Sequence, residues 1–152
     1  MAGKGRKMNR EFLEQQLQLA DKASEVLRLS YQRISKRLPL SIDLQDDVLI
    51  ELDALTSRFA RMSDILIQKV FRAVDAIELV DEGSILDRLN RAEKRSLISS
   101  AQQWREIRLL RNQIAHEYVL NDLRELFEQT IANTSELLST LDRVKQYANS
   151  QL

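Results

Sequence analysis

The stretch WREIRLLRNQIAHEY, at positions 104–118, gathers the residue types of this chain that could perform chemistry. It holds the only Trp and the only His of the sequence, and Arg111, Asn112, His116 and Tyr118 fall within eight residues. A guanidinium can clamp a phosphate group through two hydrogen bonds, and an imidazole can accept or release a proton near neutral pH. If the chain has a chemical activity, we expect its site to lie in this stretch.

The spacing of these polar residues is that of an amphipathic helix. At about 100° per residue Ile107, Leu110 and Ile114 fall on one side and are expected to enter a core, while Asn112 and His116, four apart, share a neighbouring face. Arg111 and Tyr118, seven apart, form a second row at the border of the apolar side. A plainer interpretation stays open, in which His116 is a hydrogen-bonded histidine at a helix end and Arg111 a solvated surface residue.

The pattern Arg111-Asn112-x-x-x-His116-x-Tyr118 resembles the Arg-polar-x-x-x-His-x-Tyr signature of HEPN-domain ribonucleases. It is similar in particular to the HepT-type toxins, which are encoded beside a minimal nucleotidyltransferase antitoxin. The resemblance implies the toxin of a type VII toxin–antitoxin system, a metal-independent endoribonuclease that cuts RNA, either tRNA or mRNA. It also implies a homodimer, an RNA substrate and a nucleotidyltransferase antitoxin as partners.

The likeness continues upstream through residues 54–78 and 86–108 and covers about two thirds of the chain, whereas residues 1–40 add little to it. The fold that it implies is all-α, an up-and-down bundle of about five helices. We expect one HEPN-like domain over residues 11–149. Residues 1–10 carry four basic residues and two glycines, which predicts a flexible basic arm before the domain.

The chemistry that the resemblance implies needs neither a metal nor another cofactor. RNA can be cleaved by its own 2′-hydroxyl, provided that a base removes that proton, an acid protonates the leaving oxygen and positive charge faces the phosphorus oxygens. One histidine per chain is too few for both proton transfers, so a two-fold dimer would place two copies of His116 and Arg111 around one cleft. Asn112 would complete the catalytic set by orienting the histidine or the scissile group.

Three further residues receive roles. Arg105 and Arg108 are predicted to position RNA phosphates, although they could equally be surface arginines paired with Glu106 or Asp122. By resemblance, Tyr118 is the acceptor of AMP groups that the antitoxin transfers, and the added phosphates would block a cleft built to bind phosphate. The alternative for Tyr118 is a ring packed on the core with its hydroxyl at the rim.

Two other functions remain open alongside the nuclease. The bundle could be a non-catalytic binding subunit of a nucleotidyltransferase, or a structural bundle with neither activity. Trp104 is expected in the core or in a dimer interface, because no second exposed aromatic residue accompanies it to stack on bases.

The composition agrees with a helical protein. The chain has 152 residues, 43% of them hydrophobic, with three glycines, one proline and 5% aromatic residues. It lacks cysteine and any apolar run long enough for a signal peptide or a membrane span, so we expect a cytoplasmic protein. Because the formal net charge is zero, contact with RNA must rest on local charge, and no binding to DNA is expected.

The apolar periodicity and the capping residues place the helices. A long helix is expected to end before Pro39, and Ser41 or Asp43 is predicted to cap a second one that pairs antiparallel with the first. Gly83 is predicted to end the second helix, and Ser84 with Asp87 to cap a third. The expected helices span about 10–38, 43–82, 84–92, 101–119 and 122–144.

Overall fold

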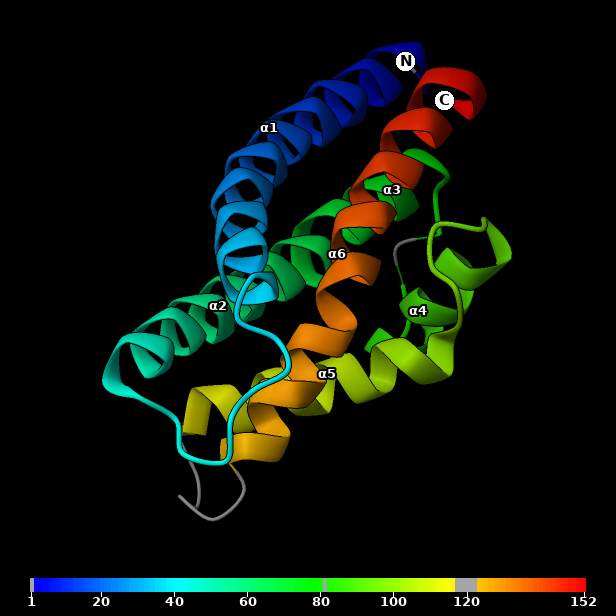
Figure 1. Ribbon diagram of the computed structural model, residues 1–152. Helices are drawn as coiled ribbons and strands as arrows, with labels where there is room; N and C mark the ends of the chain where they lie inside the picture. The colour runs from blue at the N-terminus through cyan, green and yellow to red at the C-terminus, as the bar shows by residue number, and fades with distance from the viewer. Residues whose placement is uncertain (1, 81, 117–122) are drawn as a thin grey trace.

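The computed structural model describes residues 2–80, 82–116 and 123–152, and in this part of the chain it contains helices and no strand. The elements form a bundle in which α1 packs along the path through α2, η1 and α3 and also lies beside α6, whose end is close to the start of α1 (Figure 1). The prediction of an all-α bundle of about five helices is confirmed, since α2, η1 and α3 follow one another without a break. The elements are α1 (Ala2–Ser35), α2 (Asp46–Asp64), the π-helix η1 (Ile65–Val70), α3 (Phe71–Ile77), α4 (Ile85–Lys94), α5 (Ala101–His116) and α6 (Leu123–Gln151).

Helix α1 runs antiparallel to the path formed by α2, η1 and α3, as the sequence predicts (Figure 1). Near the end of α1, Arg37 forms an ion pair with Asp47 at the start of α2, with 2.7 Å between Nη1 and Oδ2. Near the other end, the side-chain amide of Asn9 donates to the carbonyl of Ala76 at 3.3 Å. Because the partner's residue number rises as the residue number along α1 falls, the two paths must run in opposite directions.

None of the described helices is long and apolar enough to cross a membrane.

The structure continues α1 through residues 2–10, the segment expected to form a flexible basic arm. The guanidinium of Arg10 donates to the carbonyls of Ala148, at 3.3 Å, and Leu152, both at the end of α6. These bonds tie the last residue of the segment to the C-terminal helix. Its other basic residues are exposed to solvent.

The start of α2 differs from the prediction. Neither Ser41 nor Asp43 caps the helix, because it begins at Asp46 and its N-cap is Gln45, which makes no side-chain capping bond. The first turn instead holds the carboxylates of Asp46 and Asp47. Negative charge near a helix N-terminus is favoured by the helix dipole, and here it substitutes for a capping hydroxyl.

Gly83 does not end the second helical path. Helix α3 ends at Ile77, and Leu79 follows in the left-handed region with φ of 61°. The amide of Leu79 donates to the carbonyl of Ala76 and that of Val80 to Asp75, which is the Schellman arrangement of hydrogen bonds. The helix therefore stops through backbone hydrogen bonds that no glycine marks.

Gly83 instead serves the start of α4. Its φ is 96°, and a Cβ added to it would lie 2.5 Å from the Asp87 carboxylate. That carboxylate accepts from the Ser84 amide at 2.8 Å, while the Ser84 hydroxyl accepts from the Asp87 amide at 3.1 Å. The predicted capping box is confirmed, and the glycine leaves room for it.

A buried carboxylate holds α4 against α3. Asp75, which is fully buried, accepts from Arg91 at 2.9 Å and from Arg95 at 2.5 Å. Burial by itself lowers the pKa of Arg95, but the hydrogen bond and the charge of Asp75 raise it above its ordinary value. Arg88 of the same helix donates to the carbonyl of Ile67 in η1 at 3.2 Å. Helix α4 is thus fastened to both parts of the path that it covers.

Trp104 lies in the core, which is one of the two positions predicted for it, the other being a dimer interface. It is fully buried and packs on Phe71 with 5.2 Å between ring centroids. Its indole nitrogen donates to Glu136 at 2.7 Å, and the same carboxylate accepts from the Ser99 amide at 2.9 Å. This network joins α6 to α5 and to the loop before it.

Glu136 makes the stability of the fold dependent on pH. Burial by itself would raise the pKa of Glu136, but hydrogen bonds from Ser99 and Trp104 and the charge of Arg143 bring it below the ordinary value of 4.5. A lowered pKa in the folded state gives stability that is present above pH 4.5 and is lost as the pH falls through the folded value. We therefore expect Glu136→Gln to lower the free energy of unfolding by about 1–3 kcal/mol at pH 7.

Urea unfolding at pH 7 and at pH 3.5 measures this contribution. The difference between wild type and Glu136→Gln should shrink at the lower pH, since the stability that a lowered pKa gives is lost progressively below the ordinary value of 4.5. Ser139→Ala, at an exposed position of the same helix, is the control and should unfold like wild type at both values. If Glu136→Gln lowered the free energy of unfolding equally at both pH values, the shape of the side chain and not its charge would matter at this position.

Candidate active site

The motif residues are presented by α5, which is held in place by its apolar side. Trp104, Ile107 and Leu110 are buried, with exposed fractions of 0%, 0% and 5%. Of the predicted apolar face, Ile107 and Leu110 are thus buried and Ile114 is partly buried, and α5 packs against α2 and α6. Arg111 and Asn112 follow at the edge of that face and are half-buried. Their position at the edge lets them reach a neighbouring helix and solvent at once.

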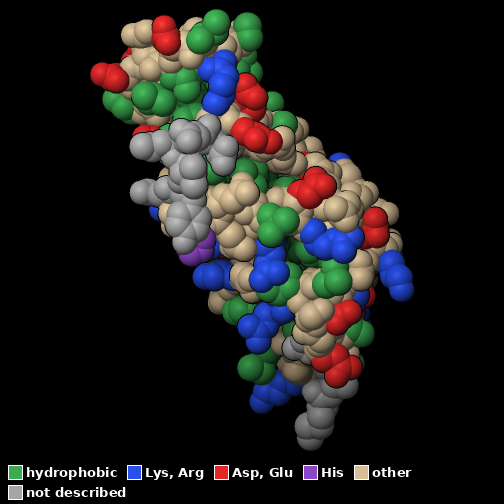
Figure 2. Space-filling model, turned by 90° about the horizontal axis from the view of Figure 1, so that it is seen from below, with side chains coloured by type: hydrophobic (Ala, Val, Ile, Leu, Met, Phe, Trp, Pro, Cys, Tyr) green, Lys and Arg blue, Asp and Glu red, His purple; other side chains and the backbone are tan. Residues whose placement is uncertain are grey.

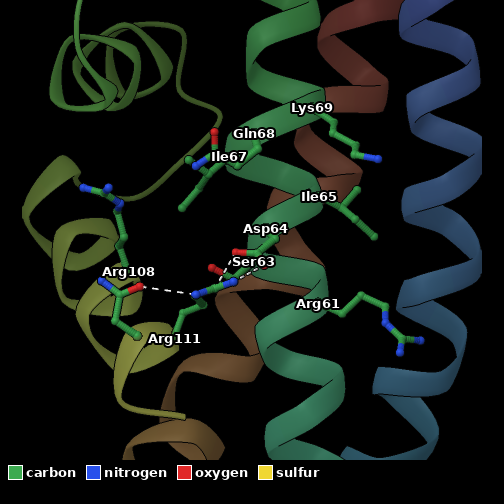
Figure 3. Close-up of a pocket in the computed structure, with 10 residues that line it drawn as sticks. Arg61, Ser63, Asp64, Ile65, Ile67, Gln68, Lys69, Arg108 and Arg111 are labelled. Atoms are coloured by element: carbon green, nitrogen blue, oxygen red, sulfur yellow. Dashed lines mark hydrogen bonds and ion pairs between the residues drawn. The ribbon is translucent and has the colours of Figure 1, made fainter. Parts of the chain in front are cut away.

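Arg111 forms a bidentate ion pair with Asp64, the last residue of α2 (Figure 3). Its Nε lies 2.7 Å from Oδ1 and its Nη2 lies 2.8 Å from Oδ2, while Nη1 faces the Asn112 carboxamide oxygen at 3.5 Å. The hydrogen bond with Asp64 raises the pKa of Arg111, against a smaller opposing effect of burial. Side-chain exposures of 34% for Arg111 and 42% for Asp64 leave the pair accessible. The guanidinium is therefore held in one plane and still open to a ligand.

The ion pair lies in the wall of a surface cavity of about 520 Å³ between α5 and the path through α2 and η1. Its lining carries four cationic side chains and a single carboxylate. In Figure 3, Arg61 and Lys69 point toward the opposite flank of α2 and η1, away from the ion pair. The positive charge nearest the ion pair therefore comes from α5, through Arg108 and Arg111. Its lining residues are Arg61, Ser63, Asp64, Ile65, Ile67, Gln68, Lys69, Arg108, Arg111 and Asn112.

One wall of this cavity is built by the π-helix η1, which begins directly after Asp64. A π-helical turn closes its hydrogen bonds over one more residue than an α-helical turn and so changes the direction in which later residues point. Asp64, before the turn, faces α5, and Asp75, after it, faces α4. Single π turns inside α-helices occur frequently at functional sites. Here the turn lets one helical path carry two carboxylates toward two different helices.

His116 is the last residue of α5 and is exposed. It follows Asn112 by four residues on a continuous helix, so the two side chains share a face. His116 is not one of the residues that line the cavity described above, and it lies about one turn beyond them. In Figure 2 the histidine, drawn in purple, lies on the same face as several lysine and arginine side chains. Tyr118 falls in residues 117–122, outside the part that the structure describes.

The two arginines expected to position RNA are both exposed on α5. Arg108 lines the cavity together with Arg111 and Asn112. Arg105 lies one turn earlier and donates to the side-chain oxygen of Gln102 at 2.5 Å. Glu106 and Asp122 were the partners considered for these two arginines, and Asp122 lies outside the described residues. The structure therefore brings Arg108 to the motif arginine and leaves Arg105 further along the helix.

Asp64 is the site residue that sequence reasoning missed. It precedes Arg111 by 47 residues, and no capping pattern or local motif marks it. Its position inside the segment 54–78, one of the stretches that carry the family likeness, is the signal that could have drawn attention to it. Only the packing of α2 against α5 shows which carboxylate faces the arginine.

Comparisons with known proteins add no relative for this site. No protein-family model matches the chain, and no curated protein matches it. The geometry of the described residues is therefore what a functional proposal must build on.

Proposed function

We propose that this chain is the toxin of a type VII toxin–antitoxin pair, a metal-independent endoribonuclease that cleaves tRNA or mRNA as a homodimer. The observation that carries the proposal is the bidentate ion pair of Arg111 with Asp64, at 2.7 and 2.8 Å, beside Asn112 in a cation-lined cavity. The two bonds hold the guanidinium through Nε and Nη2, and Nη1 faces Asn112. A guanidinium fixed in one plane and partly exposed is suited to binding a phosphate.

The proposed reaction uses the 2′-hydroxyl of the RNA as the nucleophile. One His116 imidazole removes the proton of that hydroxyl, the 2′-oxygen bonds to the adjacent phosphorus, and the bond from phosphorus to the 5′-oxygen breaks. A second, protonated imidazole gives its proton to the leaving 5′-oxygen. Arg111 balances the charge that grows on the phosphorus oxygens. The products are a 2′,3′-cyclic phosphate and a 5′-hydroxyl.

The homodimer follows from the number of imidazoles that the reaction needs. The sequence has one His, so the acid and the base must come from two chains if both are histidines. The position of His116 supports this arrangement, because it is exposed at the end of α5 and accessible to a second copy. A closed two-fold dimer would bring both imidazoles to one cleft. Arg111 of each copy would then flank the scissile phosphate.

The product ends test the reaction. Purified protein incubated with RNA in EDTA should yield fragments with a 2′,3′-cyclic phosphate and a 5′-hydroxyl, identified by mass spectrometry. The physical reason is that attack by the internal 2′-hydroxyl leaves the phosphate on the 3′ side. Cleavage that stops in EDTA and resumes with magnesium, or ends that carry a 3′-hydroxyl, would reject the mechanism. A protein that binds a nucleotidyltransferase but cuts no RNA would favour the binding subunit instead.

The proposed neutralisation acts through Tyr118. Incubation with the cognate nucleotidyltransferase and ATP should add mass in multiples of AMP at Tyr118 and abolish cleavage, because the added phosphates occupy the cleft and pair with Arg111. Tyr118→Phe should still cleave RNA and should escape both the modification and the inhibition. Tyr147→Phe is the matched control, since this tyrosine lies on α6 and bonds Glu78. An inactivated complex in which Tyr118 is unmodified would refute this part of the proposal.

A further inference from the structure

A second hollow, of about 320 Å³, adjoins the cavity of the motif arginine. It lies between α4 and α5, and its walls are apolar: Leu86 and Leu89 from α4 and Leu109 from α5. Leu86 and Leu109 are 41% and 62% exposed. Arg108 and Asn112 line both hollows, so the two lie on either side of these side chains.

We propose that this second hollow is a nucleobase subsite, which holds one unpaired base of the RNA while the adjoining phosphate binds at Arg111. The inference rests on the proposed function and adds to it the form of the substrate. A nucleotide joins an apolar, planar base to a charged phosphate through a single sugar. Two adjoining hollows, one apolar and one cationic, match these two parts.

The groups at the rim suit a base. Arg105 and Arg108 supply guanidinium planes, which can stack on a nucleobase, and Asn112 supplies a carboxamide with both a donor and an acceptor for a base edge. No carboxylate is among the residues that line this hollow, so an RNA chain meets only neutral or positive groups there. The apolar walls would cover the faces of the base. The hollow therefore matches a nucleobase in two respects: its apolar walls suit the faces of the base, and its positive rim suits the charge of the RNA chain.

A second copy of the chain is a less suitable occupant. If two α5 helices met antiparallel at Leu109, seven residues from each His116, the two histidine positions would lie ~21 Å apart along the helices, too far to serve one phosphodiester. If they met in parallel, Arg105 and Arg108 would each face the same residue of the other copy, and like charges repel. The antiparallel contact is thus incompatible with the composite cleft, and the parallel contact is opposed by charge repulsion.

This occupant restricts the substrate to RNA that is single-stranded at the cleavage site. A base in a duplex is covered by its neighbours and paired at its edge, so it must leave the stack before it can enter the hollow. Loops and unpaired segments offer such bases without that cost. By holding the base, the subsite would also fix which phosphate of the RNA lies at Arg111.

Binding of two non-cleavable probes tests the subsite. The first probe is a hexauridylate with 2′-O-methyl riboses, and the second is the same sugar–phosphate chain without bases. Affinities are measured by fluorescence anisotropy at one salt concentration. Wild type should bind the first probe about 10-fold more tightly, because one base buries apolar surface in the hollow. Leu109→Ser should lose this preference and bind the base-free probe like wild type. Ile50→Ser, at a leucine-sized position on α2 that is 68% exposed, is the matched control and should keep the preference.

Three outcomes would overturn the subsite: equal binding of both probes by wild type, equal weakening of both by Leu109→Ser, or a change of oligomeric state in Leu109→Ser by light scattering. The last would identify the leucine as a contact between copies. Cleavage of unmodified RNA by wild type is measured beside these. Base preference without cleavage would retain the subsite and reject the nuclease, whereas cleavage without base preference would reject the subsite alone.

Discussion

Replacement of His116 with alanine is expected to lower the rate of RNA cleavage by about 10²- to 10⁴-fold, the usual contribution of a general acid or base. His116 is exposed at the end of α5, so the same change should leave the fold intact, with a cooperative thermal unfolding transition. Single-turnover cleavage of a labelled RNA at saturating protein measures the effect on the chemical step. A His116→Ala variant that cleaves at the wild-type rate would remove this residue from the mechanism.

Mixed dimers make the test specific to a shared cleft. A heterodimer of one wild-type chain and one His116→Ala chain has a single imidazole, so it should retain little activity if the two transfers need both copies. Full activity of the heterodimer, or an active species that is a monomer by light scattering, would contradict the composite cleft.

The role of Asp64 can be separated from that of Arg111 in the same assay. Arg111→Ala should reduce cleavage by about 10²- to 10³-fold, through the loss of charge at the phosphate. Asp64→Asn keeps the arginine but weakens the bidentate ion pair that holds its plane, so a smaller loss is expected. Arg72→Ala, which removes an exposed arginine on α3, is the matched control and should cleave like wild type. If Asp64→Asn cleaved faster than wild type, the carboxylate would be a competitor of the phosphate and not a support of the arginine.

Replacement of Asp75 with alanine is expected to lower the free energy of unfolding by about 3–5 kcal/mol. Asp75 is fully buried, and its removal takes from Arg91 its carboxylate partner and leaves Arg95 with Glu78 alone. Uncompensated buried charge is costly because the protein interior solvates it poorly. Urea unfolding followed by circular dichroism gives the value.

Two variants bracket this prediction. Asp75→Asn keeps an acceptor of the same shape and should lose less stability than Asp75→Ala. Asp142→Ala removes an exposed carboxylate on α6 and should change the free energy of unfolding by less than about 0.5 kcal/mol. If Asp75→Ala behaved like Asp142→Ala, the network would be no stronger than an exposed surface ion pair.

Local sequence determined the helical class of this protein and the start of α4. Helical periodicity is a property of residues three and four apart, so it is legible without the fold, and the apolar face of α5 lay where it predicted. The capping box of Ser84 and Asp87 is equally local, because both partners lie within one turn. Where a helix terminus depends on the backbone alone, the prediction was wrong. Leu79 adopts a positive φ that its residue type disfavours, and no side chain announces it.

The site divides in the same way. The run from Arg111 to His116 could be found in the sequence because one helix presents all of it, and so could the two arginines before it. The partner of Arg111 could not, because Asp64 is 47 residues away and meets it only where α2 packs against α5. The same holds for the apolar hollow, whose walls come from α4 and α5. Contacts between distant segments depend on how whole helices pack and rotate, including the π turn after Asp64, and the spacing of residues along one helix carries no information about that rotation.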